Sequence, residues 1–237
     1  MKRSSHQHGA GRPPKQAKLT FGKNITPQVA SVPSEQVKAR TSRRNTARLA
    51  SQNEVRLKPP PKAENGFSIT EIAGDIFDAP DGTVLIHACN CLGSWGAGIA
   101  AAFKERYPNA YKRYNEHCRS REPDNLVNTA LLIPPQESKS KHWVGCLFTS
   151  RKYGRNKDSP QQILDATGPS FRDLVEQMSE AGDEVTQIRM CQINSGLFSV
   201  PWEHSRAIIQ GLELDDNVKI PREIFVYSLP NKTDRSQ

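Results

Sequence analysis

The sequence lacks the features that would place the chain in a membrane or outside the cell. No apolar run approaches the roughly 18 residues of a membrane-spanning helix. The opening residues, MKRSSHQHGAGR, contain no apolar stretch of the kind found in secretory signals. The five cysteines form no C-x-x-C pair and no metal-ligand spacing. We therefore expect an intracellular protein, cytoplasmic or nuclear, with reduced thiols, no membrane contact, and no metal or other cofactor.

The first quarter of the chain is poor in aromatic and acidic residues. Residues 1–62 hold one aromatic residue, Phe21, and two acids against fourteen Lys and Arg, a net charge of +12. The whole chain carries +8, so the remainder is acidic at −4. Such a segment buries too little apolar surface to offset its ordering entropy. We expect a disordered basic tail over residues 1–64 and one monomeric domain over residues 65–237.

The basic tail has several open interpretations. Runs of Lys and Arg attract nucleic acid or nuclear import receptors. Gly11, Arg12 and Pro13 resemble the core of an AT-hook, which binds the minor groove of DNA. A soluble tail without a specific partner is an equally good interpretation.

Beyond residue 65, strand-like and helix-like segments alternate. This pattern predicts an α/β fold with a mostly parallel sheet and helices on both faces. Strands are expected over residues 67–70, 83–88, 130–133, 143–149, 188–194 and 224–228, and helices over 98–107, 109–119, 160–180 and 201–214. Ligands of such sheets bind at the carboxyl ends of the strands.

Several common enzyme signatures are missing. The chain has no G-K-[ST] phosphate loop, no C-x5-R, no D-x-D and no G-x-S-x-G. Cys146 lies five residues before Arg151, one short of the C-x5-R spacing. A covalent phospho-enzyme is therefore unsupported, and any hydrolysis would use water directly.

Three loops at the expected strand ends are unusual. One contains Gly74, Asp75 and Ile76. Two others, ACNCLGSWGAG (88–98) and NSGLFSVP (194–201), join a strand to a helix N-terminus through small residues. Glycine lets backbone N–H groups approach a ligand closely, and a helix N-terminus adds positive potential. Two such loops side by side predict a slot for a diphosphate, although each alone could be only a tight turn.

With these loops, residues 66–230 resemble a macro domain, the family that binds ADP-ribose. Gly74-Asp75-Ile76 resembles its G-D-I turn, and His87-Ala88-Cys89-Asn90 stands where the family has N-A-A-N. The glycine-rich segment 93–100 resembles the first phosphate loop and segment 194–201 the second. The resemblance implies a three-layer α/β/α fold with a mixed, mostly parallel central sheet. His87 replaces the family's first Asn, and Ser199 replaces a Gly.

The strings IHACNCLGSWGAGIA, CLFTS and QINSGLFSVPW are similar to a fungal branch, the ADP-ribose 1″-phosphate phosphatases. This implies hydrolysis of ADP-ribose 1″-phosphate, a by-product of tRNA splicing, to ADP-ribose and phosphate. Two alternatives stay open: a non-catalytic ADP-ribose-binding module, and a hydrolase of protein-linked ADP-ribose. The hydrolase alternative is weakened because Ser150 and Phe198 stand where a relative of that kind has Lys and Asp.

The resemblance also implies roles for individual residues. Asp75 would accept the adenine amino group, unless it only bonds its own turn. Asn90 would hold the terminal ribose and align water, and His87 could act as acid or base or be a core histidine. Phe198 could wall the ribose or fill the core. The candidate catalytic residues are Asn90 and His87, and the candidate substrate-binding residues are Gly74, Asp75, Ile76, Cys89, Asn90, Cys91, Gly96, Ala97, Gly98, Ile99, Ala100, Ala101, Asn194, Ser195, Gly196, Leu197, Phe198, Ser199 and Val200.

Overall fold

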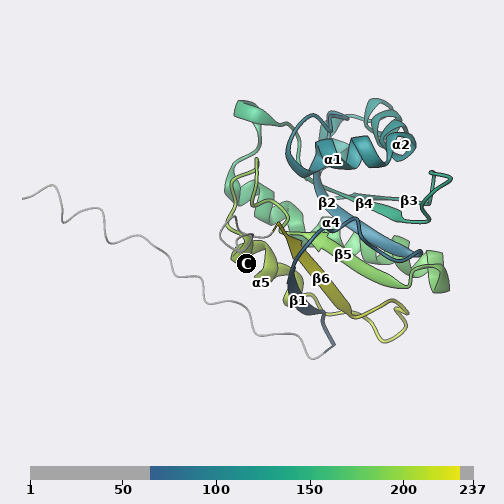
Figure 1. Cartoon of the computed structure of the whole chain (residues 1–237). Coiled ribbons are helices and arrows are strands. Elements are labelled where there is room, and N and C mark those ends of the chain that lie inside the picture. The colour runs from purple at the N-terminus through teal and green to yellow at the C-terminus, as the bar shows by residue number, and fades with distance from the viewer. Residues whose placement is uncertain (1–64, 230–237) are drawn as a thin grey trace, which may run out of the picture. The chain divides into compact units, whose positions relative to one another are not determined.

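The computed structural model of the chain describes residues 65–229 (Figure 1). The basic tail expected over residues 1–64, with its AT-hook-like motif, lies outside the described residues. No helix within residues 65–229 combines the length and the apolar content that crossing a bilayer requires.

Six strands form one mixed sheet. Its order is β1-β6-β5-β2-β4-β3, and every neighbouring pair is parallel except β3 and β4, which are antiparallel. Strands β2 and β4 are almost wholly buried, as expected for apolar runs without polar alternation. The strands are β1 (Ser68–Ala73), β2 (Thr83–Asn90), β3 (Ala130–Ile133), β4 (Trp143–Ser150), β5 (Gln187–Cys191) and β6 (Glu223–Ser228).

Helices cover both faces of the sheet, which confirms the three-layer prediction. Helices α1 and α2 lie on one face and α4 and α5 on the other (Figure 1), each over its own apolar cluster. The α-helices are α1 (Gly98–Arg106), α2 (Pro108–Arg119), α3 (Pro123–Leu126), α4 (Pro160–Ala181) and α5 (Trp202–Gln210). Two 3-10 helices, η1 (Gly154–Asn156) and η2 (Gly182–Glu184), flank α4.

Some predicted boundaries were wrong, for local reasons. The first strand runs on to Ala73 because it pairs with β6 along its whole length. The strand expected over 188–194 ends at Cys191, and Asn194 has a left-handed φ of 63° that no strand continues through. The helix expected over 201–214 ends at Gln210, before Gly211. Helix α3 was not predicted.

Candidate functional site

Two loops lie side by side at the carboxyl edge of the sheet. We call residues 91–97, between β2 and α1, loop 1, and residues 192–201, between β5 and α5, loop 2. Strands β2 and β5 are neighbours in the sheet, so the two loops leave it next to each other. A Cβ placed on Gly98 would lie only 3.6 Å from Leu197 Cδ1, which shows how closely loop 2 approaches the start of α1.

The helices that follow these loops begin without a side-chain cap. Ala97 is the N-cap of α1 and Pro201 that of α5, and neither side chain accepts a bond from the first turn. By contrast, α4 starts with a complete capping box between Ser159 and Gln162. The first amides of a helix have no partner inside it. Residues 96–99 are also exposed, so the start of α1 offers unpaired donors and positive potential to an anion.

Loop 1 is held from inside by Asn90. Its Oδ1 accepts the backbone N–H of Leu92 at 3.0 Å and of Ser94 at 3.3 Å, and its Nδ2 donates to the carbonyl of Ser94 at 2.6 Å. Asn90 is only 6% exposed. In this arrangement the amide that was predicted to hold the ribose is occupied in shaping the loop.

Aromatic packing anchors the middle of loop 1. Trp95 is buried and stacks on Tyr114 at 4.9 Å, and the Tyr114 hydroxyl donates to the carbonyl of Asn90 at 2.6 Å. The Nε1 atom of Trp95 is buried and finds no partner within the described part of the chain. Gly93 has a φ of 72°, and its carbonyl accepts a bond from Asn115 Nδ2 at 2.9 Å. The loop therefore forms a firm platform below the exposed residues 96–99.

Loop 2 is held by Asn194 in a similar way. Its Oδ1 accepts a hydrogen bond from Thr149 at 2.8 Å, and its Nδ2 donates to Thr167 and to Ser205, each at 3.0 Å. These partners come from β4, α4 and α5, and the Asn194 side chain is buried among them. The predicted ligand residue thus ties the loop to the sheet, while residues 195–197 are exposed at the rim.

Loop 2 is also contacted by a cation that is not among the candidate residues predicted from the sequence. Lys157 Nζ donates to the carbonyl of Leu197 at 2.9 Å and to the hydroxyl of Ser199 at 3.0 Å. Ser199 has a φ of 60°, which a residue other than glycine rarely adopts. Ser199, which stands where the family has Gly, is therefore held in this conformation by a lysine from the β4–α4 loop.

Asp75 lies at the other end of the edge, after β1. Its Oδ1 accepts the backbone N–H of Phe77 at 3.0 Å, so the turn interaction left open by the sequence is present. Its Oδ2 pairs with Arg106 at 3.0 Å, and the Arg106 guanidinium lies 4.6 Å above the Phe77 ring. A carboxylate has about four lone-pair positions and can still accept an amino group. Gly74 donates to Ser228, and Ile76 is buried beneath the turn.

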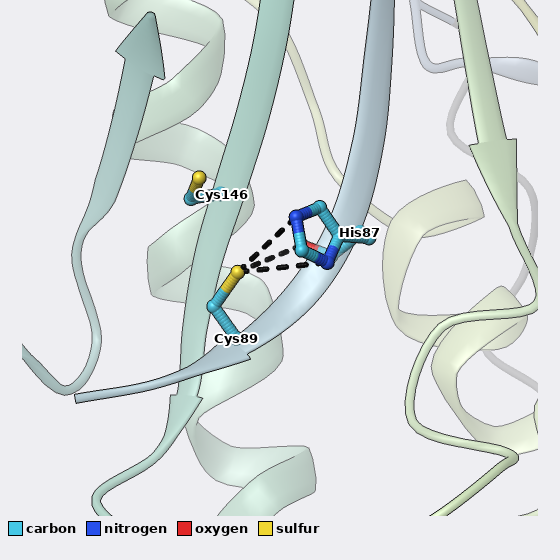
Figure 2. Close-up of side chains that lie close together, drawn as sticks. All are labelled: His87, Cys89 and Cys146. Carbon is cyan, nitrogen blue, oxygen red and sulfur yellow. Dashed lines mark hydrogen bonds between the residues drawn. The ribbon is translucent and has the colours of Figure 1, made fainter. Parts of the chain in front are cut away.

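His87 lies in the core, and Figure 2 shows it with two cysteines. The ring is fully buried and stacks on Phe103 at 4.1 Å. The position favours the core-histidine interpretation that the sequence left open. Cys89 follows on the same strand, and Cys146 is the β4 partner of His87.

These three residues place their ligand atoms within 4.8 Å of one another. However, Cys89 Sγ is 3.6 Å from Nδ1 and 3.5 Å from Nε2 of His87. A sulfur equidistant from both nitrogens cannot lie along the in-plane lone pair of either. The arrangement therefore does not have the geometry of metal ligands, and the expectation of a metal-free site stays a prediction.

The thiols near loop 1 are poor nucleophiles. Burial raises the pKa of Cys89 well above its ordinary value, and it raises the pKa of Cys91 to about 12. Only the thiolate attacks, so both side chains stay inert near neutral pH. Both belong to the apolar cluster below α1 and α2, which agrees with a packing role.

A separate hollow of about 310 Å³ lies between α2 and β3. Its lining includes Arg113 and His117 of α2, Leu131 of β3, and Pro134, which directly follows β3. It shares no residue with loop 1 or loop 2. We therefore place the candidate site at the loops.

A mixed sheet between two layers of helices, with two loops side by side at its carboxyl edge, is the architecture implied by the resemblance to a macro domain. The family model named Macro domain matches residues 86–209, and the chain belongs to this family. The match spans both loops, from β2 to α5.

Among named proteins, the chain is similar to several fungal enzymes called ADP-ribose 1″-phosphate phosphatase. It is 48% identical to the one from Chaetomium globosum over 158 residues, which cover 62% of this chain and 85% of the relative. It is 42% identical to the one from Aspergillus oryzae over 188 residues, which cover 65% of this chain and 93% of the relative.

Among solved structures, the fold is similar to the macrodomain of Mycobacterium tuberculosis DarG. The TM-score is 0.53 at 20% identity, over 70% of this chain and all of that one. It is also similar to Thermosipho africanus DarTG in complex with ADP-ribose, with a TM-score of 0.53 at 18% identity, over 71% of this chain and 43% of that one.

Sequence reasoning missed two charged residues of the site. Arg106 lies within the predicted helix 98–107, but its pairing with Asp75 could not be read from residues 31 positions apart. Lys157 belongs to the run RKYGRNK (151–157), whose four cations and one aromatic residue were a usable signal. Such a run beside a strand end indicates a cationic rim.

Proposed function

We propose that this chain hydrolyses ADP-ribose 1″-phosphate to ADP-ribose and inorganic phosphate. The observation that carries the proposal is the 48% identity to a phosphatase of that name over a stretch that is 62% of this chain. The shared family and the paired loops support the same ligand class.

We further propose how the substrate lies along the sheet edge. Asp75 would accept the adenine amino group, and the diphosphate would lie between the exposed starts of α1 and loop 2. Asn90 supports the terminal ribose, either directly or through the loop 1 backbone that it shapes. Preorganised amides of this kind stabilise phosphate charge without a metal. Leu197, which is 63% exposed, has to move off Gly98 to admit the diphosphate.

The proposed reaction is a direct attack by water on the terminal phosphorus. The new bond joins the water oxygen to phosphorus, and the bond between phosphorus and the C1″ oxygen breaks. That oxygen takes up a proton to give ADP-ribose, and phosphate leaves. The thiols close to loop 1 are protonated and buried, which favours water as the nucleophile over cysteine.

We propose that the basic tail binds nucleic acid or a nuclear import receptor and that the protein works in the cytoplasm or nucleus. The charge of +12 over residues 1–62 supports an anionic partner. Binding of duplex DNA by the whole chain should weaken steeply as salt rises from 50 to 200 mM. A salt-independent or absent interaction would leave the import receptor as the partner to test.

The test of the activity is phosphate release from ADP-ribose 1″-phosphate. The matched control is Gly196→Glu, because a Cβ on Gly196 meets nothing within 4 Å and the new carboxylate would repel the diphosphate. We expect release by the natural protein, loss of release by the variant, and equal melting temperatures. Tight ADP-ribose binding by the natural protein without release would instead identify a binding module.

A further inference from the structure

We propose that Lys157 binds the terminal phosphate of the substrate and makes the site prefer ADP-ribose 1″-phosphate to ADP-ribose. The inference rests on the proposed function and names the residue that distinguishes substrate from product. It starts from three observations: the order of the strands, the contacts of Lys157 and the charge around it.

The strand order gives the direction of the ligand. Along the carboxyl edge, the sheet presents β1 with Asp75, then β6, then β5 with loop 2, then β2 with loop 1, then β4. A ligand with its base at Asp75 and its diphosphate between the loops therefore points its other end toward β4. Neighbouring strands are about 4.8 Å apart, so the end of β4 lies one strand beyond loop 1. Lys157 is in the loop that follows β4.

The contacts of Lys157 place its charge against loop 2, which the chain after β4 reaches from its own end of the sheet. Its Nζ bonds Leu197 and Ser199 of loop 2, which lie 40 and 42 residues further along the chain. A lysine ammonium has three N–H donors. These two bonds leave one donor and the full positive charge for a phosphate oxygen.

The charge of Lys157 is not neutralised by a carboxylate within residues 65–229. Four ion pairs occur in this part of the chain, and none includes Lys157, Lys152 or Arg155. Arg151 differs, because it pairs with Asp124 and Asp158. The rim after β4 thus presents three lysine and arginine side chains without an ion pair, and one of them, Lys157, bonds loop 2.

The contact between Lys157 and Ser199 could also serve only to support loop 2. Ser199 holds a left-handed backbone at φ 60°, and Lys157 donates to its hydroxyl. A lysine that only held this loop would affect every ligand of the site equally. A lysine that binds the terminal phosphate would affect only the ligand that carries one. This difference separates the two explanations experimentally.

The experiment compares Lys157→Gln with the natural protein and with Lys152→Gln, an exposed lysine of the same loop that makes no ion pair. The KM for ADP-ribose 1″-phosphate is measured by phosphate release, and the Kd for ADP-ribose by calorimetry. We expect Lys157→Gln to raise the KM about 10- to 100-fold, as expected for loss of a charged hydrogen bond. The Kd for ADP-ribose should change less than about twofold, and Lys152→Gln should change neither value by more than about twofold.

Two results would overturn the proposal: equal weakening of both ligands by Lys157→Gln, which would reduce Lys157 to a loop support, and no effect on either. If the natural protein releases no phosphate, the proposed function fails instead. Because ADP-ribose 1″-phosphate would then remain intact, its binding to the natural protein and to Lys157→Gln can be measured directly by calorimetry. A selective loss of its affinity in Lys157→Gln would still support the assignment of Lys157, and an unchanged ratio would refute it.

Discussion

Replacing Gly93 by alanine tests whether loop 1 is a rigid platform. Gly93 has a φ of 72°, which costs an alanine about 1–2 kcal/mol. The new Cβ would also lie 2.8 Å from Asn115 Nδ2 and 3.3 Å from Cys118 Cβ. Asn115 cannot yield freely, since its Nδ2 already donates to the Gly93 carbonyl. Overpacking of this kind costs about 1–3 kcal/mol.

The matched control is Gly154→Ala. Gly154 has a φ of 66°, close to that of Gly93, but a Cβ there meets nothing within 4 Å. We expect its free energy of unfolding to fall by about 1–2 kcal/mol, the backbone cost alone. For Gly93→Ala we expect about 2–5 kcal/mol, or about 4–20 °C in Tm for a folded domain of this size.

The assay is urea unfolding followed by tryptophan fluorescence, which reports on Trp95, stacked against Tyr114, together with Trp143 and Trp202. Equal losses in the two variants, within about 0.5 kcal/mol, would refute the reasoning. They would mean that α2 moves away from loop 1 at little cost. The loop would then be a soft segment and not a platform.

The remaining predictions concern Asn90 and the thiols. Asn90→Ala removes three partly buried hydrogen bonds of loop 1, so the free energy of unfolding should fall by about 2–4 kcal/mol and the KM should rise. Loss of kcat with unchanged stability and KM would instead give Asn90 a direct role in the chemistry. Burial raises the pKa of Cys91 to about 12 and that of Cys89 well above its ordinary value, so both are protonated at pH 8. Mass spectrometry should find them unalkylated by iodoacetamide in the native protein and modified in urea. Rapid native labelling would show that loop 1 opens.

The layer order was predictable from the sequence because its signals are local. The aliphatic run 83–88 predicted a strand buried on both faces, and Ser159-Pro160 marked the start of α4. The ends of elements were less predictable. Leu212 and Leu214 extend the apolar pattern of α5 and are buried, yet the helix stops before Gly211 and they pack from an irregular segment.

The site was predictable as a pair of loops but not as a set of side-chain contacts. Small residues after a strand indicate exposed amides, and this signal is local. The side chains of Asn90 and Asn194 turn inward. Asn90 bonds backbone groups of loop 1 that need partners, and Asn194 bonds buried hydroxyls of β4, α4 and α5. The contact between Lys157 and Leu197 joins residues 40 positions apart, so only the folded chain reveals it.

The difference in N-terminal capping between α4 and the two helices α1 and α5 has a consequence for the stability of the protein. Helix α4 is completed by its own serine, whereas α1 and α5 begin with no such group. An anion bound there would accept hydrogen bonds from the first amides of α1 and α5, which no side chain caps. Its binding would favour the folded state by mass action. The resistance of this protein to heat and proteolysis would then rise with the concentration of its ligand. Molecules without bound ligand would be degraded first.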